Sequence, residues 1–232
     1  MFNKVFEEKV RIIDGIYSTV DEKYLTGDNL KYHNFYNKIA RVYTLLMRTF
    51  FFFKFGGEKN FREQFLKDLN ISDSNKVLEV SIGTADNIRF LNRNAEYFGL
   101  DLSMAMLRQA KRHLKKWNIN SKLILGEGEN LPFNDNFFDC VFHVGGINFF
   151  NDKQKAISEM IRVAKPGTRL LIVDETDKWV KESYQKNILF KNEFKDAGDV
   201  SIPVKLIPDD MKDINTEIIC KGLMYKITFI KP

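Results

Sequence analysis

Short apolar segments alternate with polar, helix-forming stretches between residues 76 and 175, and this alternation constrains the fold more than any other feature. Each apolar segment has the length of a buried strand, and each intervening stretch is long enough for a crossover connection. The pattern therefore predicts an α/β fold whose parallel sheet is covered by helices on both faces. The five predicted strands are Lys76–Val80, Ala95–Leu100, Lys122–Leu125, Phe138–His143 and Arg169–Asp174.

A turn of small residues follows the first predicted strand, within Val-Leu-Glu-Val-Ser-Ile-Gly-Thr-Ala-Asp-Asn at residues 77–87. Gly83 can adopt a positive φ, and the small side chains of Ser81 and Ala85 let a ligand approach the backbone closely. Glu79 comes before the turn, where its carboxylate can accept from an ammonium group. A turn that binds dinucleotide phosphates would gain nothing from this acid, so we expect a ligand that carries an amine.

A second acid, Asp101, ends the next predicted strand about 20 residues beyond the turn, a span that fits strand, crossover helix and strand. Ser103 follows as a helix N-cap, and the residues after it, 104–116, predict a helix. A carboxylate at this strand end can accept from both ribose hydroxyls of an adenosine. The alternative is that Asp101 is an ordinary loop acid, which its register with the preceding turn disfavours.

Two further motifs follow in the sequence. Residues 126–133 read Gly-Glu-Gly-Glu-Asn-Leu-Pro-Phe, and residues 163–173 contain a Lys-Pro-Gly turn before the fifth predicted strand. Together with the turn at residues 77–87 and Asp101, these motifs resemble the class I S-adenosylmethionine-dependent methyltransferases in their order and spacing. The resemblance covers about residues 76–175.

The resemblance implies a cofactor site for S-adenosylmethionine across the carboxyl ends of the strands. In such proteins the acid at Glu127 meets the adenine amine, and the backbone N–H of Gly128 meets a ring nitrogen. Glu127 is one methylene longer than the usual aspartate, and Ser81 and Ala85 stand where the family usually has glycine. The implied cofactor-binding residues are Glu79, Ser81, Gly83, Thr84, Ala85, Asp101, Leu102, Met106, Glu127, Gly128, Glu129 and His143, together with Tyr36 and Tyr43.

His143 closes the fourth predicted strand at the methyl end of the expected cleft. It is the histidine placed for acid–base catalysis, although a histidine there could instead pack or bond to the backbone. Asp174 and Glu175, at the end of the fifth strand, are open to a substrate-orienting or a structural role. His33 and His113 lie on predicted helices without an evident partner, and we expect both to be exposed.

Residues 1–75 precede the first core strand and predict a helical extension. Its segment 35–43, Phe-Tyr-Asn-Lys-Ile-Ala-Arg-Val-Tyr, resembles the segment of the ubiquinone/menaquinone-biosynthesis-type methyltransferases that folds over the cofactor. Tyr36 and Tyr43 would then contact the methionine end of the cofactor, or else pack in the core of an amphipathic helix. The predicted helices of the extension are Glu7–Val20, Leu30–Phe55 and Lys59–Leu69.

The phenylalanine-rich run of residues 50–55 places apolar side chains on every side of its helix. The run could pack into the sheet layer, line an apolar acceptor pocket or touch a membrane, and packing is the favoured interpretation. We expect residues 30–55 as a whole to cover the cofactor and to form one wall of a largely apolar acceptor pocket. Asn37 and Thr44 depart from the subgroup, since both replace its usual aspartates.

The C-terminal residues predict two antiparallel strands, Asn215–Cys220 and Leu223–Ile230, joined at a glycine-containing turn. Class I methyltransferases finish their sheet with such a reversed strand. The predicted fold is therefore α/β, with a Rossmann-like, seven-stranded, mostly parallel sheet and a reversed C-terminal strand. Residues 1–75 would form the helical lid or extension, and residues 76–232 the cofactor-binding core.

The composition fits one globular α/β protein of 232 residues, 44% hydrophobic and 29% charged, with a net charge of +5. Much of the positive charge is spaced like the solvated face of the helix at 104–116, so nucleic acid is not an expected partner. Cys140 and Cys220 lack metal-ligand spacing, which predicts no metal site and fits a reducing compartment. Residues 1–10 are too charged for a signal peptide and residues 42–55 too short to span a bilayer, which favours the cytoplasm.

These observations favour one function and leave an alternative open. The leading hypothesis is an S-adenosylmethionine-dependent methyltransferase that acts on a small hydrophobic or aromatic molecule. The alternative is an S-adenosylmethionine-binding protein without transferase activity, because Ser81 and Ala85 depart from the glycine pattern. An NAD-dependent oxidoreductase is disfavoured by Glu79 and by the reversed C-terminal hairpin. The identity of the acceptor, the methylated atom and the oligomeric state do not follow from the sequence.

Overall fold

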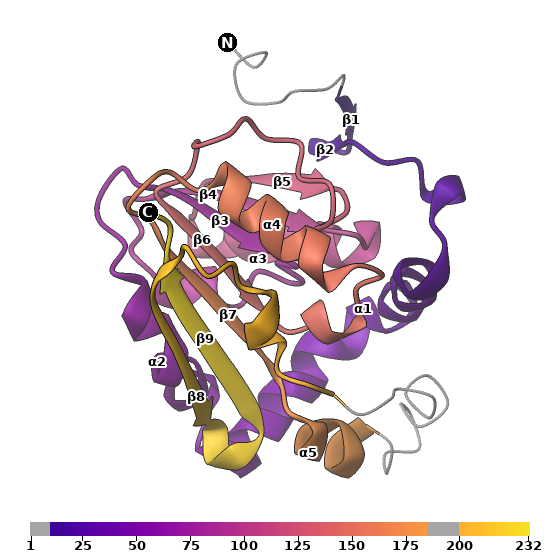
Figure 1. Ribbon diagram of the computed structural model, residues 1–232. Coiled ribbons are helices and arrows are strands. Elements are labelled where there is room, and N and C mark those ends of the chain that lie inside the picture. The colour runs from indigo at the N-terminus through magenta and orange to yellow at the C-terminus, as the bar shows by residue number, and fades with distance from the viewer. Residues whose placement is uncertain (1–9, 185–199) are drawn as a thin grey trace.

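A nine-stranded sheet forms the centre of the computed structural model, which describes residues 10–184 and 200–232 (Figure 1). The strand order is β1-β2-β5-β4-β3-β6-β7-β9-β8, and the pairs from β5 to β7 are parallel. Because β4 and β6 lie on opposite sides of β3, the carboxyl ends of β3 and β6 flank the switch point of the sheet. The central strands are β3 (Lys76–Val80), β4 (Glu96–Asp101), β5 (Ser121–Leu125), β6 (Cys140–Val144) and β7 (Arg169–Glu175).

The parallel core agrees with the sequence prediction at every strand, with bounds that differ by at most two residues. The C-terminal hairpin is also confirmed, because β8 (Lys212–Ile219) and β9 (Met224–Ile230) are antiparallel and β9 lies reversed between β7 and β8. The connection between them contains Cys220 and Lys221, with positive φ values of 53° and 60°. This hairpin completes the sheet on the β7 side.

A second hairpin extends the opposite side of the sheet and corrects the helix predicted for residues 7–20. Strands β1 (Arg11–Ile13) and β2 (Ile16–Ser18) are antiparallel, and β2 pairs with β5 in parallel. Asp14 and Gly15 have φ values of 53° and 72°, as a two-residue hairpin turn requires. The helix prediction was wrong in the described part of this segment, and the sheet has nine strands rather than seven.

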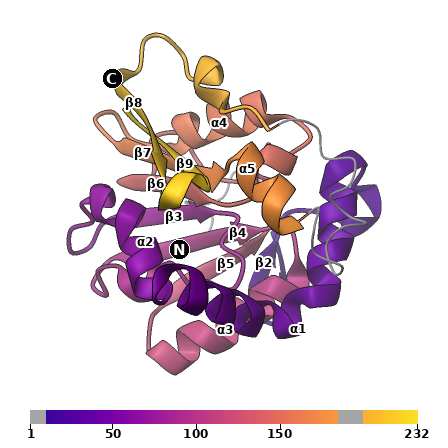
Figure 2. The same cartoon turned by 90° about the horizontal axis from the view of Figure 1, so that it is seen from below.

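Helices cover the sheet on both faces, as predicted (Figures 1 and 2). Alternate strand residues point to opposite faces, so Val77 and Tyr97 pack with the first three helices, whereas Leu78 and Phe98 pack with α4. The helices are α1 (Gly27–Phe55), α2 (Glu58–Leu66), α3 (Met104–Trp117), α4 (Lys153–Val163) and α5 (Asp177–Trp179), which a π-helical turn, Val180–Tyr184, follows. Short 3-10 turns occur at Glu22–Tyr24, Lys67–Leu69, Ile88–Phe90, Ile147–Phe149, Pro203–Leu206 and Cys220–Gly222. No helix in the described part of the chain is both long and apolar enough to cross a bilayer.

The long helix α1 passes the carboxyl ends of three strands in turn (Figure 2). Its residues Asn29, His33 and Thr44 contact the loops that follow β5, β4 and β3 respectively. Gly56 and Gly57, with φ values of 73° and 119°, then end α1 and lead into α2. The two helices predicted for this part of the extension are therefore confirmed, with small shifts of their bounds.

The extension shares one hydrophobic core with the sheet. Phe51 of α1 and Phe61 of α2 are buried in the same cluster as Val77 of β3. The rings of Phe51 and Phe61 stack with their centroids 4.3 Å apart. The phenylalanine-rich run thus packs through Phe51, whereas Phe52 and Phe53 are exposed. Division of the chain into an extension and a core stays a prediction.

Candidate functional site

The turn after β3 carries three left-handed residues at alternate positions. Ser81, Gly83 and Ala85 have φ values of 60°, 55° and 64°. The Ile82 N–H between them donates to the Leu100 carbonyl oxygen at 2.9 Å, which anchors the turn to β4. No atom lies within 4 Å of the position that a Gly83 side chain would take, so a ligand can approach the backbone there. The positive φ predicted at Gly83 is confirmed, and Ser81 and Ala85 adopt strained conformations that glycine would adopt freely.

Asp101 holds this turn against the end of β4. Its Oδ2 accepts from the Gly83 N–H and its Oδ1 from the Ser103 N–H, each at 2.8 Å. Each carboxylate oxygen can accept a second hydrogen bond, and Asp101 lines the cleft, so it can bind ligand hydroxyls. Burial raises the pKa of Asp101 above its ordinary value. Ser103 caps α3 as predicted, because its Oγ accepts from the Met106 N–H at 3.2 Å.

Glu79 lies behind the turn rather than in the cleft. Its side chain is fully buried, and its Oε1 accepts from Asn87 Nδ2 at 2.5 Å. The Arg62 guanidinium in turn donates to Asn87 Oδ1, which ties α2 to β3. Glu79 Oε2 has no hydrogen-bond partner among the described residues, and burial raises the pKa of Glu79 to about 8. Asn87 lines the cleft and Glu79 does not, so the contact of Glu79 with a ligand amine stays a prediction.

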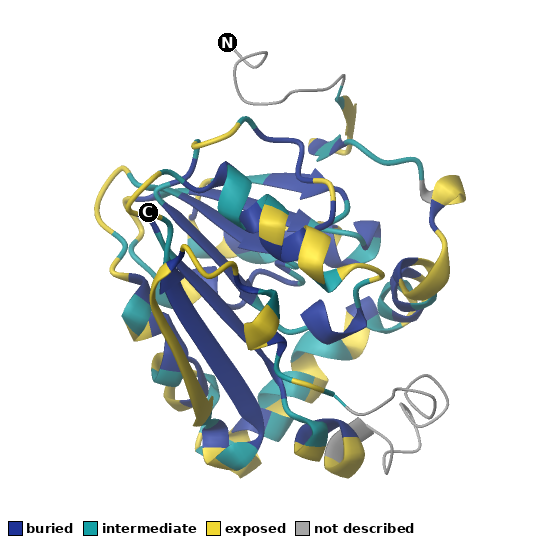
Figure 3. Ribbon diagram, in the orientation of Figure 1, coloured by how far each residue is buried: buried dark blue, intermediate teal, exposed yellow. Residues whose placement is uncertain are grey.

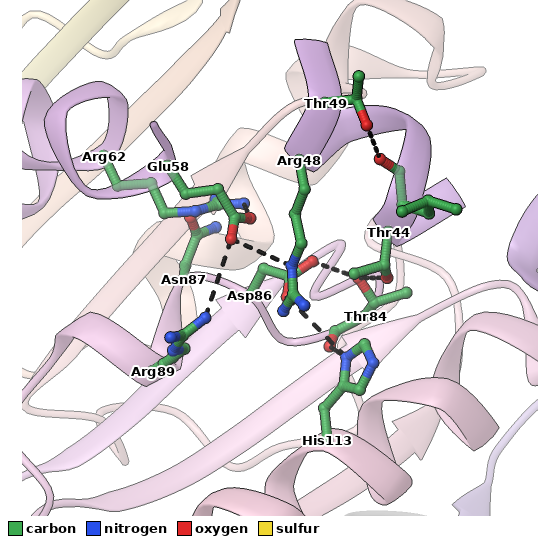
Figure 4. Close-up of polar contacts among 11 residues, drawn as sticks. Thr44, Arg48, Thr49, Glu58, Arg62, Thr84, Asp86, Asn87, Arg89 and His113 are labelled. Atoms are coloured by element: carbon green, nitrogen blue, oxygen red, sulfur yellow. Dashed lines mark hydrogen bonds and ion pairs between the residues drawn. The ribbon is translucent and has the colours of Figure 1, made fainter. Parts of the chain in front are cut away.

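A polar network fastens the N-terminal extension to the same turn (Figure 4). Arg48 of α1 pairs through Nε with Glu58 Oε2 of α2 at 3.2 Å, and through Nη2 with Asp86 Oδ1 of the turn at 3.6 Å. Thr84 Oγ1 donates to Asp86 Oδ2 at 2.7 Å and accepts from Thr44 Oγ1 of α1 at 3.3 Å. Thr44, which departs from the family pattern, thus contacts the turn through its hydroxyl.

The start of α1 covers the loop that follows β5. Asn29 Nδ2 donates to Glu127 Oε1 at 3.1 Å and to Glu129 Oε1 at 3.2 Å. A side chain at Gly128 would meet the Phe150 ring at 2.5 Å, so the loop requires glycine there. Asn29 and Phe150 line the cleft, whereas Glu127, Gly128 and Glu129 do not. The adenine contacts implied for Glu127 and Gly128 stay a prediction, and they require Asn29 to share or release these carboxylates.

Two histidines that we expected to be exposed are held in place. His33 is only 7% exposed and lines the cleft, with its Nδ1 2.9 Å from the Leu102 carbonyl oxygen. His113 of α3 is partly buried, with its Nδ1 3.0 Å from the Thr84 carbonyl oxygen. Asn37 fixes the crossing of α1 over α3, since its Oδ1 accepts from the hydroxyl that caps α3 at 2.6 Å. The expectation of exposure was wrong because it considered each helix alone, whereas contacts with neighbouring elements bury these two rings.

The cleft is also lined by a set of aromatic side chains, Tyr36, Tyr43, Phe149 and Trp179, which we call its aromatic end. Tyr36 and Tyr43 of α1 both line it, with ring centroids 6.1 Å apart, and burial raises the pKa of each hydroxyl. Trp179 of α5, Met224 of β9 and Phe149 also line the cleft. Tyr36 and Tyr43 thus face the cleft, as one of the two sequence interpretations requires.

Two adjacent acids at the end of β7 have different roles, which the sequence left open. Asp174 is fully buried and accepts from the Gly146 N–H at 3.1 Å and from the Asn148 N–H at 2.9 Å, so it fixes the loop after β6. Glu175 points to the opposite face of the strand and lines the cleft. Its Oε1 lies 3.9 Å from the position that a Gly145 side chain would take. Asp174 is therefore structural, and Glu175 is a carboxylate at the aromatic end of the cleft.

His143 bonds to the backbone, which is one of the two roles that the sequence left open, and it does not line the cleft. It is fully buried, its Nε2 accepts from the Ile147 N–H at 2.9 Å, and its Nδ1 donates to the Val80 carbonyl oxygen at 3.0 Å. Because Nε2 accepts from a backbone N–H, the imidazole ring is neutral. Burial favours the same state, since it lowers the pKa of His143. The backbone engages both ring nitrogens, which leaves neither for an acceptor.

The cleft encloses about 1200 Å³, including the solvent in its mouth. Eight of the predicted cofactor residues line it, namely Ser81, Gly83, Thr84, Asp101, Leu102, Met106, Tyr36 and Tyr43. The predicted residues that do not line it are Glu79, Ala85, Glu127, Gly128, Glu129 and His143. Sequence reasoning missed other lining residues, among them Asn29, His33, Arg62, Asn87 and Trp179, most of which come from distant elements. The apolar inner face of α1 was the available signal, but it does not tell which turn of the helix meets which loop.

Comparisons with known proteins agree with this geometry. Residues 78–172 match the family model described as a methyltransferase domain. The chain is 33% identical over 153 residues to a demethylmenaquinone methyltransferase of Thermotoga maritima, and this match covers 64% of each protein. It is 32% identical over 121 residues, half of each protein, to a ubiquinone/menaquinone biosynthesis C-methyltransferase of Burkholderia mallei. The chain thus spans from 50% to 64% of the length of these curated relatives.

A solved structure gives the same fold. The SAM-dependent methyltransferase from Aquifex aeolicus superposes with a TM-score of 0.55. The match covers 74% of this chain and 89% of that one, at 19% sequence identity. At this low identity the likeness concerns the architecture, and it confirms the Rossmann-like sheet that the sequence predicts.

Proposed function

We propose that the chain is an S-adenosylmethionine-dependent methyltransferase that acts on a small hydrophobic or aromatic molecule, because residues 78–172 match the methyltransferase-domain model. One observation carries the proposal: the cleft at the carboxyl ends of the parallel strands is lined both by a left-handed turn with Asp101 and by aromatic side chains. Open α/β sheets usually bind their ligands at this switch point. The turn with Asp101 suits a cofactor, and the aromatic side chains suit an acceptor.

The donor set of the cofactor end fits S-adenosylmethionine. The open backbone at Gly83 lets the cofactor approach closely, and Asp101 offers two carboxylate oxygens to the ribose hydroxyls. Leu102 and Met106 add apolar surface beside Asp101. The cofactor, when bound, supplies an electrophilic methyl group, so the chain's own residues have to orient the acceptor and exclude water.

The aromatic end suits a flat, apolar acceptor. Tyr36, Tyr43 and Trp179 line this end, and aromatic side chains bind other rings by stacking or edge-to-face contact. The relatives named as a demethylmenaquinone methyltransferase and a ubiquinone/menaquinone biosynthesis C-methyltransferase favour a quinone-type ring within this class. Glu175 then lies at the acceptor, where its carboxylate can hold a ring hydroxyl or take up its proton.

Separate measurements of binding and turnover test the proposal. Thermal unfolding should show stabilisation by S-adenosylmethionine and S-adenosylhomocysteine but not by NAD, by about 2.7 kcal/mol at a ligand concentration of roughly 100 Kd. Transfer of a labelled methyl group to a demethylated menaquinone, followed by mass spectrometry of the product, tests the acceptor. Stabilisation by NAD with none from the two S-adenosyl compounds would reject the proposal.

The second candidate is an S-adenosylmethionine-binding protein without transferase activity. The observation that favours it is the strained turn, in which Ser81 and Ala85 hold positive φ values of 60° and 64° at positions where the family usually has glycine. Binding of both S-adenosyl compounds, with no label transferred to any component of a lipid extract, would favour this candidate over the first.

A further inference from the structure

Helix α1 carries an apolar stripe on its outer face, between residues 42 and 53. Val42, Leu45, Leu46, Phe52 and Phe53 recur with helical spacing and share this face. They are 50%, 70%, 38%, 65% and 81% exposed, respectively. Figure 3 shows the exposed residues along this helix. Contiguous apolar surface of this kind on a protein marks a site of contact with a partner or a membrane.

The stripe is continuous because its polar position is satisfied within the helix. Thr49 lies between Leu46 and Phe52, and its hydroxyl donates to the Leu45 carbonyl oxygen at 2.9 Å (Figure 4). A hydroxyl bonded back to its own helix needs no partner from water. Phe52 and Phe53 lie edge to face, with ring centroids 5.5 Å apart, at the end of the stripe. The apolar surface therefore extends over about three helical turns.

The same segment is strongly cationic. Residues 29–57 contain no aspartate or glutamate. Arg48 is engaged by Glu58 and Asp86, whereas Lys38, Arg41 and Lys54 are exposed. Two such faces brought together would place like charges opposite one another, which disfavours a second copy of the chain as the partner. The five cations of the segment are Lys31, Lys38, Arg41, Arg48 and Lys54.

We propose that the outer face of α1 binds an anionic lipid bilayer, with the apolar stripe in the interface and the exposed cations at the headgroups. Phenylalanine and leucine on one face, with lysine and arginine beside them, form the pattern of helices that lie in the plane of a membrane. The inner face of the same segment lines the cleft through Tyr43, Met47 and Phe51, so one helix separates the cleft from the bilayer. The proposal concerns binding alone and holds whether or not the chain transfers a methyl group.

Sedimentation of the full chain with lipid vesicles tests this proposal. Vesicles of phosphatidylglycerol and phosphatidylcholine should bind the chain, vesicles of phosphatidylcholine alone should bind it less, and salt should weaken the binding. The double variant Phe52→Ser/Phe53→Ser should lower the partition coefficient about tenfold or more, because it removes inserted apolar surface but no charge. The control Ile214→Ser/Ile218→Ser changes residues of β8 that are 40% and 56% exposed, and it should bind like the wild type.

A charge variant and two physical measurements complete the test. Lys38→Glu/Arg41→Glu should abolish the preference for anionic vesicles, while circular dichroism and thermal unfolding show that each variant is folded. Absence of binding by the wild-type chain to anionic vesicles at low ionic strength would overturn the proposal, as would equal binding by the Phe52→Ser/Phe53→Ser variant. The proposal would also be overturned if light scattering showed a wild-type dimer that the Phe52→Ser/Phe53→Ser substitutions dissociate. A second copy of the chain would then cover the stripe.

Discussion

Two sets of residues line the cleft, a cofactor end and an aromatic end, and they are built in different ways. The cofactor end consists of one turn at residues 81–87 and the carboxylate of Asp101, which come from consecutive βα units and hold each other through backbone hydrogen bonds. The aromatic end collects single side chains from distant elements, such as Tyr43 of α1, Glu175 of β7 and Trp179 of α5. Backbone geometry sets the first end, and the docking of a remote helix sets the second. The proposed function therefore predicts that cofactor binding and acceptor choice can be changed separately.

This difference predicts which quantity each end controls. Substitutions in the turn should change cofactor affinity, because they alter the backbone that the cofactor approaches. Substitutions at the aromatic end should change methyl transfer while cofactor affinity stays near its wild-type value. Measurements on variants of each set of residues test this difference.

The largest effect should come from Gly83→Val at the cofactor end. Valine disfavours the φ of 55° found there, and its branched side chain fills the space now open to a ligand. Isothermal titration with S-adenosylhomocysteine should show binding weakened by roughly 100-fold or more. Ser81→Gly is the matched control, because it relaxes a strained residue of the same turn and should bind like the wild type. Normal binding by Gly83→Val would show that the ligand does not approach this turn.

Asp101→Ala should weaken cofactor binding next most, by roughly 100-fold, because it removes two charge-assisted hydrogen bonds of about 1.5–3 kcal/mol each. Glu127→Gln should weaken binding less than about tenfold, since Asn29 already engages this carboxylate. Titration of both variants measures the difference. Unfolding of the free proteins is the control, because Asp101→Ala also leaves the Gly83 N–H without its acceptor. Equal losses of affinity would mean that the turn does not dominate the cofactor end.

Glu175→Gln should act at the aromatic end alone. We expect methyl transfer to fall by about 10- to 100-fold, because glutamine can orient an acceptor hydroxyl but cannot take up its proton. Affinity for S-adenosylhomocysteine should stay within about twofold. Asp174→Asn is the contrasting variant: it should lower the thermal midpoint, because Asp174 accepts from two backbone N–H groups. A parallel loss of cofactor affinity in Glu175→Gln would assign this carboxylate to the other end.

The smallest effect concerns Glu79, which lines neither end. Burial raises its pKa from 4.5 to about 8, so the folded state keeps a proton that the unfolded state releases. The stabilisation from this proton is complete below about pH 4.5 and is lost as the pH rises through about 8. Urea unfolding across this range should show the wild type losing stability relative to Glu79→Gln, which cannot titrate. Equal slopes in wild type and Glu79→Gln would contradict the raised pKa of Glu79.

The fold and the cofactor end could be predicted from the sequence because both are local. The strands follow from short apolar runs, and Gly83 and Asp101 follow from their distance to those runs. The β1–β2 hairpin was missed although Asp14-Gly15 is a strong hairpin signal, because the segment is also apolar enough for a helix. A local pattern therefore distinguishes a helix from a strand only where the two differ in expected length or in turn residues.

The aromatic end could not be predicted in the same way, because its parts meet only in the folded chain. A shift of one residue in β7 would exchange the roles of Asp174 and Glu175. The burial of His33 depends on where α1 crosses the sheet, which no local pattern fixes. Glu79 cannot be assigned from the sequence either. Its position suggests a ligand contact, but its carboxyl group accepts from Asn87, which Arg62 of α2 holds in place.

The contact from Arg62 through Asn87 to Glu79 also bears on the shortest piece of this polypeptide that can fold by itself. Every motif of the cofactor end follows residue 75, which makes residues 76–232 an obvious fragment to express. That fragment would lose the guanidinium beside Asn87, and water would reach Val77 where Phe61 now packs. Leaving a buried acceptor such as Asn87 Oδ1 without its donor costs about 1–3 kcal/mol, and the exposed core adds to this loss, whereas an average domain is stable by only about 5–15 kcal/mol. A truncation at residue 75 should therefore leave a collapsed chain without cofactor affinity, although it keeps every residue of the matched family model.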